Sequence, residues 1–157
     1  MDLFFKAVEQ NDLLKVKELL DSGVNINGRD KYGYSALHIA SFKALDEMAI
    51  FLISKGIDLN IQDKNGQTIL HYTALNNQLS IANAALNLGA SLSIEDAHGN
   101  EPLWTAVFND KGRNDRIEMI ELFLRHGADV NHRNKVGKSS KDIVTIAGYN
   151  NLKPLIN

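Results

Sequence analysis

The segment DKNGQTILHYT, residues 63–73, decides the fold because its pattern of residue types occurs three times. It returns as DKYGYSALHIA at residues 30–40 and as DAHGNEPLWTA at residues 96–106. The shared glycine recurs once more, giving Gly33, Gly66, Gly99 and Gly137 at spacings of 33, 33 and 38 residues. A second series has the same spacings: Gly23, Gly56, Gly89 and Gly127. Two series in one phase indicate an internal repeat, with five residues inserted in one copy.

Each period is predicted to hold a tight turn, two short helices and a return loop. Gly66 and its equivalents follow Asp-x-x or Asn-x-x, a composition typical of tight turns. Gly56, Gly89 and Gly127 are predicted to end helices, where glycine enters the left-handed conformation without a steric penalty. Isolated helices shorter than about 12 to 15 residues are marginal in water, so each repeat must bury its apolar stripe against its neighbours. The sequence therefore predicts an all-α repeat solenoid.

The repeated segments resemble the ankyrin repeat, whose pattern is Gly-x-Thr-Pro-Leu-His, a helix pair and then Gly-Ala-Asp-x-Asn. The second half of the pattern is present as SKGIDLN at residues 54–60 and RHGADVN at residues 125–131. The resemblance implies one domain, residues 1–157, of about five stacked repeats with hairpin-tip loops. The expected repeats are 1–30, 31–63, 64–96, 97–134 and 135–157. The two terminal repeats are expected to act as caps, since Lys141 and Asp142 replace the buried Leu and the His of the pattern.

The fourth repeat departs most from the pattern. Glu101 replaces Thr, Trp104 replaces His, and five residues are inserted around Asp110 to Asn114. We expect Trp104 to pack at a repeat interface and the insertion to form a mobile excursion between helices. The C-terminal third is also similar to small bacterial ankyrin proteins, some of which are regarded as toxin-immunity proteins.

Charge and composition argue against several classes of partner and cofactor. The net charge is -2 and the basic residues are scattered, which argues against a nucleic-acid partner. No cysteine is present, no apolar run is long enough to span a bilayer, and the N-terminal residues do not resemble a signal peptide. We therefore expect a cytoplasmic protein that has no cofactor and does not bind a membrane.

No catalytic or metal-binding constellation is recognisable. The sequence lacks Gly-x-Ser-x-Gly, His-Glu-x-x-His and Gly-x-Gly-x-x-Gly. Asp30, Asp63 and Asp96 recur once per repeat, which favours a role in the turn over a role in catalysis. His38 and His71 lie at the His position of the ankyrin pattern, where the resemblance implies hydrogen bonds at the start of a helix. A metal site would need further ligands, so no metal is expected.

The ankyrin resemblance implies a non-catalytic protein that binds another protein through its hairpin tips and the exposed ends of its first helices. The corresponding residues are Tyr32, Tyr34, Phe42, Lys43, Lys64, Asn65, Gln67, Leu75, Asn76, His98, Asn100, Phe108 and Asn109. Aromatic residues among them favour binding, because interface hot spots are enriched in aromatics. We expect an inhibitor or immunity-type protein that neutralises a toxin or enzyme. An architectural scaffold or adaptor is the alternative, and an enzyme is the least favoured class.

Overall fold

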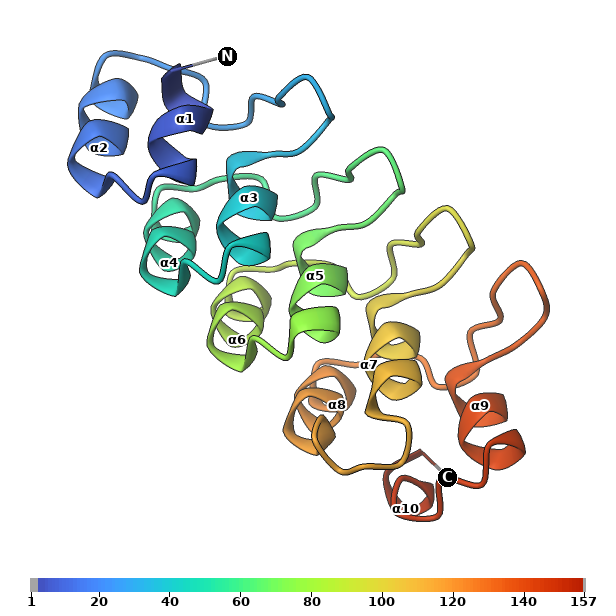
Figure 1. Cartoon of the computed structure of the whole chain (residues 1–157). Coiled ribbons are helices and arrows are strands. Elements are labelled where there is room, and N and C mark those ends of the chain that lie inside the picture. The colour runs from blue at the N-terminus through green and yellow to red at the C-terminus, as the bar shows by residue number, and fades with distance from the viewer. Residues whose placement is uncertain (1–2, 157) are drawn as a thin grey trace.

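The computed structural model describes residues 3–156, in which every regular element is helical (Figure 1). The helices follow one another in pairs, so the predicted all-α repeat solenoid is confirmed. In chain order they are α1 (Leu3–Glu9), α2 (Leu13–Asp21), α3 (Ala36–Phe42), α4 (Asp46–Ser54), α5 (Ile69–Asn76), α6 (Leu79–Asn87), α7 (Pro102–Asp110), α8 (Ile117–Arg125), α9 (Ser140–Ile146) and α10 (Lys153–Ile156).

The helices form two parallel rows. Helices α1, α3, α5, α7 and α9 form the inner row, in which each contacts the next (Figure 1). In the outer row, α4 contacts α6 and α6 contacts α8. Within the first two repeats, α1 packs on α2 and α3 packs on α4. Four hairpin loops project to one side, beyond the inner row (Figure 1). The inner helices and the hairpins together form a surface that runs the length of the molecule.

Each hairpin is held by a side chain that accepts two backbone hydrogen bonds. Asp63 Oδ1 accepts the N–H groups of Asn65 and Gln67 at 2.8 and 2.9 Å. Asp30 and Asp96 make the same pair of bonds, and Asn134 does so in the last hairpin. The predicted turn role of the three aspartates is therefore confirmed, and an amide oxygen serves equally well.

Histidine fixes the start of two inner helices. The Thr68 N–H donates to His71 Nδ1 at 3.1 Å, which leaves the proton on His71 Nε2 to donate to the Asn100 carbonyl at 2.9 Å. His38 makes the equivalent bonds with Ser35 and the Gln67 carbonyl. Each histidine thus caps its own helix and joins it to the following repeat, which confirms their structural role.

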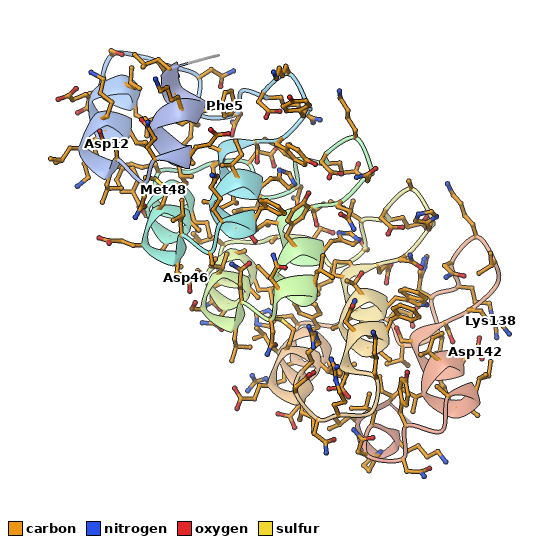
Figure 2. All side chains as sticks on the ribbon, viewed as in Figure 1. Phe5, Asp12, Asp46, Met48, Lys138 and Asp142 are labelled. Carbon is orange, nitrogen blue, oxygen red and sulfur yellow. The ribbon has the colours of Figure 1, made fainter. Side chains whose placement is uncertain are left out.

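In the last repeat, Asp142 caps the start of α9 as His38 and His71 cap α3 and α5, but it makes no bond to a following repeat within residues 3–156. Asp142 lies in the first turn of α9 (Figure 2). Its Oδ2 accepts the Ser139 N–H at 3.1 Å, and its N–H donates to Ser139 Oγ at 3.1 Å. The adjacent Lys141 is exposed, whereas Leu70 at the equivalent position is fully buried. These polar substitutions fit the end of the stack, where no further repeat follows within residues 3–156.

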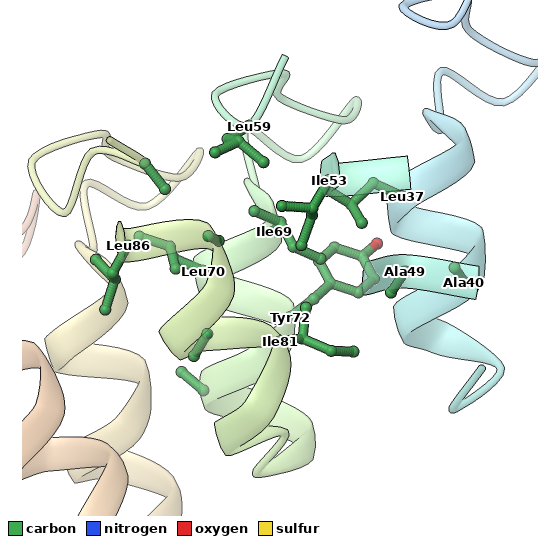
Figure 3. Packing of buried hydrophobic residues seen from close by; sticks show 14 of the residues in the cluster. Leu37, Ala40, Ala49, Ile53, Leu59, Ile69, Leu70, Tyr72, Ile81 and Leu86 are labelled. Carbon is green, nitrogen blue, oxygen red and sulfur yellow. The ribbon is translucent and has the colours of Figure 1, made fainter. Parts of the chain in front are cut away.

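The core is a continuous apolar layer between the two rows. Leu37 and Ile53 of the second repeat pack with Ile69 and Tyr72 of the third in one buried cluster (Figure 3). The cluster extends from Phe4 in α1 to Ile156 in α10. Helices α1 to α9 have only seven to nine residues and α10 has four, so none would be stable alone in water. Stability therefore comes from contacts between neighbouring repeats.

The insertion in the fourth repeat is held by hydrogen bonds to the residues around it, and its mobility stays a prediction. Its first part lengthens α7 to nine residues, and the remainder is held by the buried Asp110. Asp110 Oδ1 accepts the Arg116 N–H at 2.9 Å, and Oδ2 accepts the Asn114 N–H at 3.3 Å. Asn114 also hydrogen-bonds Asn151 near the C-terminal helix. The segment is thus fastened at both ends and covers part of the last repeat.

We predict that Asp110→Ala lowers the free energy of unfolding by about 1.5 to 3 kcal/mol, because it removes charged hydrogen bonds and leaves a backbone donor without its acceptor. Asp115→Ala is the matched control in the same loop. Asp115 forms an exposed ion pair with Arg113 and a second pair with the largely buried Arg116, and its own carboxylate is 44% exposed. Ion pairs open to solvent are worth about 0 to 1 kcal/mol. Urea unfolding of both variants measures the difference, and equal losses would contradict the assigned role of Asp110.

Candidate protein-binding surface

An exposed apolar residue occupies the same position in four successive inner helices. It lies four residues after the capping position, at the C-terminal end of α3, α5, α7 and α9. The residues are Phe42, Leu75, Phe108 and Ile146, which are 75%, 44%, 45% and 68% exposed. We call this set the apolar stripe. Large apolar side chains at one register position in consecutive repeats form a row, which distinguishes them from isolated surface residues.

The packing of the inner helices explains why this position is exposed. Helices α3, α5 and α7 each contact an outer partner and the inner helices before and after them, and α9 contacts α7 and α10. The last turn of the helix therefore has one side without a neighbour. Phe42 and Ile146, which are 75% and 68% exposed, gain little stability from being apolar, whereas Phe108 also stacks on Trp104 of its own helix.

The hairpin tips extend the same surface. Tyr32, Asn65, His98 and Val136 occupy equivalent tip positions, and all four are exposed. Backbone bonds join successive tips, with Ala97 N–H donating to the Asn65 carbonyl at 2.7 Å and Lys135 N–H to the His98 carbonyl at 3.0 Å. The first two tips are joined instead by the Lys64 side chain, whose Nζ donates to the Lys31 carbonyl at 3.2 Å.

Most residues predicted to contact a partner reach solvent on this surface. The exposed ones are Tyr32, Phe42, Lys43, Lys64, Asn65, Leu75, Asn76, His98 and Phe108. Tyr34, Gln67 and Asn109 are half-buried, and Asn100 is buried. Their role in binding stays a prediction, but the structure brings the exposed ones onto a single face.

Asn100, which was predicted to contact a partner, is buried in the free chain. It is 7% exposed, its Nδ2 donates to Asp96 Oδ2 at 3.2 Å, and its Oδ1 accepts from Asn134 Nδ2 at 2.8 Å. These bonds join two hairpins. Because both polar atoms of the amide are engaged within the chain, Asn100 acts as a structural link.

Tyr34 is likewise less exposed than expected. It packs against the apolar core, and its ring centroid lies 6.3 Å from that of His38. Replacing Tyr34 would therefore disturb the hairpin as well as the surface. This residue is a poor test of binding.

Trp104 contributes to the surface through Phe108. The two rings stack on α7, with centroids 4.7 Å apart and planes inclined by 12°. The Trp104 Nε1–H is buried without a hydrogen-bond partner among residues 3–156. Trp104 is half-buried, and its ring packs beneath the exposed Phe108 of its own helix. Tryptophan at the capping position thus supports the apolar stripe.

Sequence reasoning missed two exposed apolar residues, Val136 and Ile146. They are 78% and 68% exposed. Each lies 38 residues after its equivalent in the fourth repeat, His98 or Phe108. The period alone could have placed them, although the motif around them has changed.

Titratable groups gather at one place on the surface, around the half-buried His132. Its Nε2 lies 3.4 Å from Glu95 Oε1, and its Nδ1 lies 3.6 Å from Glu101 Oε1. Burial raises the pKa of Glu101, while the nearby His132 lowers it. No group of three His, Cys, Asp or Glu suited to a metal ion occurs within residues 3–156.

Burial lowers the pKa of His38 and His71 below the usual value of 6.5. The unfolded chain takes up protons below about pH 6.5 that the folded histidines refuse, so stability falls as the pH falls. We predict a loss of up to about 1.4 kcal/mol per pH unit for each histidine.

Urea unfolding at pH 7.5 and 5.5 tests this prediction by comparing variants with the wild type. His71→Gln should be less stable at pH 7.5 and should show a smaller difference between the two pH values. His98→Asn, on an exposed tip, should keep the wild-type difference. The raised pKa of Glu101 makes the free energy of unfolding rise as the pH falls, which opposes the effect of the histidines. Because the wild type and both variants retain Glu101, this contribution cancels when each variant is compared with the wild type. An unchanged difference in His71→Gln would contradict the prediction.

Comparison with known proteins agrees with this architecture. A family model described as ankyrin repeats, in three copies, matches residues 2–63 and 43–134. A mouse protein named ankyrin repeat, SAM and basic leucine zipper domain-containing protein 1 is 40% identical over 52 residues. That match covers 33% of this chain and 11% of the mouse protein. In the part of the chain that the structure describes, no helix is long and apolar enough to cross a membrane.

Proposed function

Because the chain belongs to the ankyrin-repeat family, we propose that it is a non-catalytic module that binds another protein through the apolar stripe and the hairpin tips. Ankyrin repeats are protein-interaction modules, and this chain presents the continuous surface that such a role requires. The proposal further assigns the contacts to specific residues. Phe42, Leu75, Phe108 and Ile146 form the centre of the binding surface, and Tyr32, Asn65, His98 and Val136 form its edge.

The apolar stripe is the observation that carries the proposal. Interface hot spots are enriched in aromatic residues that become desolvated in the complex. Phe42 and Phe108 are well placed for this, since each is exposed in the free chain and lies at the end of a rigid helix. Rigid anchors lose little conformational entropy on binding, which favours affinity.

We propose that the partner is a toxin or enzyme that is inhibited when its working surface is covered. Because the apolar stripe spans four repeats, the bound chain covers a long strip of its partner and can block access to the partner's active site. The resemblance of the C-terminal third to immunity-type ankyrin proteins supports the same role. An adaptor would bind through the same stripe and leave the partner active.

Capture of the partner with matched variants tests the binding surface. The wild-type chain and a triple variant, Phe42→Ala with Leu75→Ala and Phe108→Ala, are immobilised and exposed to extract of the native organism. Leu14→Ala and Leu88→Ala serve as controls, because both leucines are exposed and lie outside the stripe. A protein retained by the wild type and both controls, and released by the triple variant, supports the assignment.

The inhibitory role is tested on that purified partner. Its toxicity or catalytic rate is measured with increasing amounts of the chain. Inhibition that saturates at one chain per partner supports the antagonist, whereas full activity in the saturated complex would assign an adaptor. Equal capture by the triple variant and the controls would contradict the binding surface itself.

A further inference from the structure

A pocket of about 280 Å³ opens at the N-terminal end of the binding surface. It lies between the end of α1, the first hairpin and α3, with Tyr72 of α5 on its far side. Small-molecule sites usually measure about 300 to 1,000 Å³, so this pocket fits a single side chain better than a cofactor. It adjoins the first residue of the apolar stripe, Phe42.

Aromatic rings form most of the pocket wall. Tyr32, Tyr34, Phe42 and Tyr72 all line it. The Tyr72 hydroxyl donates a hydrogen bond to Asp63 Oδ2 at 3.0 Å, which fixes the side chain. Its ring packs edge-on against that of His38, with the two ring centroids 5.1 Å apart. An aromatic wall of this kind attracts a cation, because the face of each ring carries partial negative charge.

Two half-buried carboxylates line the same pocket. Glu9 occupies the stripe position of the first repeat, 33 residues before Phe42, and Asp30 lies at the base of the first hairpin. Neither forms an ion pair with any residue from 3 to 156. The pocket is therefore lined by two carboxylates and one ammonium group, that of Lys43, which leaves an excess of negative charge beside its aromatic rings.

Comparison with the other hairpins shows what is distinctive about Asp30. The Oδ2 atom of Asp63 accepts from Tyr72, and that of Asp96 accepts from Asn100. Asp30 Oδ1 holds the turn, but no hydrogen bond within the described chain reaches Asp30 Oδ2. One carboxylate oxygen thus remains available to a ligand at the first hairpin only.

The positive charges nearby leave room for an incoming cation. Lys43 lines the pocket, and its exposed side chain can extend into solvent. Lys31 Nζ lies 4.7 Å from the centroid of the Tyr32 ring, so the exposed Lys31 side chain must move into solvent for a guanidinium group to stack on that ring. Burial lowers the pKa of His38, so its ring adds no positive charge at neutral pH.

We propose that this pocket binds an arginine side chain of the partner protein. The inference rests on the proposed function and names one chemical feature of the partner. A guanidinium group is flat, so it stacks on the rings of Tyr32 and Phe42 while it donates hydrogen bonds to Glu9 and Asp30. Arginine is favoured over lysine because its planar group suits both stacking and paired bonds to carboxylates.

The test is an NMR titration of the whole chain with the blocked tripeptide acetyl-Gly-Arg-Gly-amide. The same tripeptide with citrulline in place of arginine is the matched probe, since citrulline has nearly the same shape and no charge. We expect saturable shifts at Tyr32, Phe42 and their neighbours with the arginine peptide in the millimolar range. Citrulline should bind at least about tenfold more weakly, a difference of about 1.4 kcal/mol.

Two substitutions remove the negative charges of the pocket and keep its shape. Glu9→Gln preserves the side-chain length, and Asp30→Asn keeps the oxygen that holds the turn, as Asn134 does in the last hairpin. The double variant should lose at least about tenfold in affinity for the arginine peptide. Leu88→Ala, which removes an exposed leucine outside both the pocket and the stripe, should bind the peptide like the wild type.

The outcomes separate this inference from the proposed function. No saturable shift with the arginine peptide, equal binding of citrulline or unchanged binding by the double variant would each overturn the arginine pocket. Loss of the captured partner in the stripe triple variant would still support the protein-binding surface in that case. Conversely, a specific arginine peptide signal together with undiminished capture by the triple variant would support the pocket and overturn the stripe.

Discussion

Replacing Phe42 or Phe108 by Ala is expected to weaken partner binding more than tenfold. Phe42 is 75% exposed in the free chain, so its truncation should change the free energy of unfolding by no more than about 0.5 kcal/mol. Phe108 is 45% exposed and stacks on Trp104, so its truncation should cost about 0.5 to 3 kcal/mol of stability. In the complex the same rings would be desolvated, and hot-spot aromatics then cost about 2 kcal/mol or more on truncation. At about 1.4 kcal/mol per decade, each variant should lose over tenfold in affinity.

Paired measurements on each variant separate binding from stability. The dissociation constant comes from titration of the captured partner, and the free energy of unfolding comes from urea denaturation. Leu14→Ala removes an exposed leucine of α2, which lies in the outer row. It should leave both quantities unchanged. If Phe42→Ala and Phe108→Ala bind with the affinity of Leu14→Ala, the stripe is not the binding surface.

The repeat period explains how much could be predicted from the sequence. A register that recurs every 33 residues places every residue of one repeat once the motif is aligned. The exposure of Phe42, Leu75 and Phe108 follows from that register, because equivalent positions in stacked helices have equivalent neighbours. The capping role of His38 and His71 follows in the same way.

Two side chains make hydrogen bonds that the sequence pattern does not indicate. Asn100 is buried because Asn134, 34 residues later, donates to its amide oxygen. Asp110 organises the insertion by accepting backbone N–H groups up to six residues away. No local pattern in the sequence indicates these hydrogen bonds, because Asn and Asp are also common in loops where their side chains are exposed to water.

The fifth repeat shows a different limit. Its motif has lost the buried Leu and the His, so only the 38-residue spacing of the glycines, and not the motif, could have placed a stripe position there. The structure nevertheless places α9 in the inner row, with Ile146 at the end of that helix (Figure 1). The backbone register is therefore kept by packing between repeats even where the motif residues have changed.

Replacing Leu52 by Ala is expected to lower the free energy of unfolding by about 2 to 5 kcal/mol without changing the binding surface. Leu52 is fully buried in α4, which contacts both α3 and α6. Truncation removes apolar contacts and leaves a cavity, and the tightly packed core cannot close it completely.

The linear architecture makes this loss especially informative. A solenoid has no single central core, so its stability is a sum of repeat and nearest-neighbour terms, and one weakened interface affects both repeats beside it. Urea denaturation should show a lower midpoint for Leu52→Ala than for Leu14→Ala, its exposed counterpart in α2. The folded fraction of Leu52→Ala should bind the partner with wild-type affinity, since the stripe is intact. A stability loss below about 1 kcal/mol, or weakened binding by the folded variant, would show that the outer row does not act as the independent structural support assigned to it.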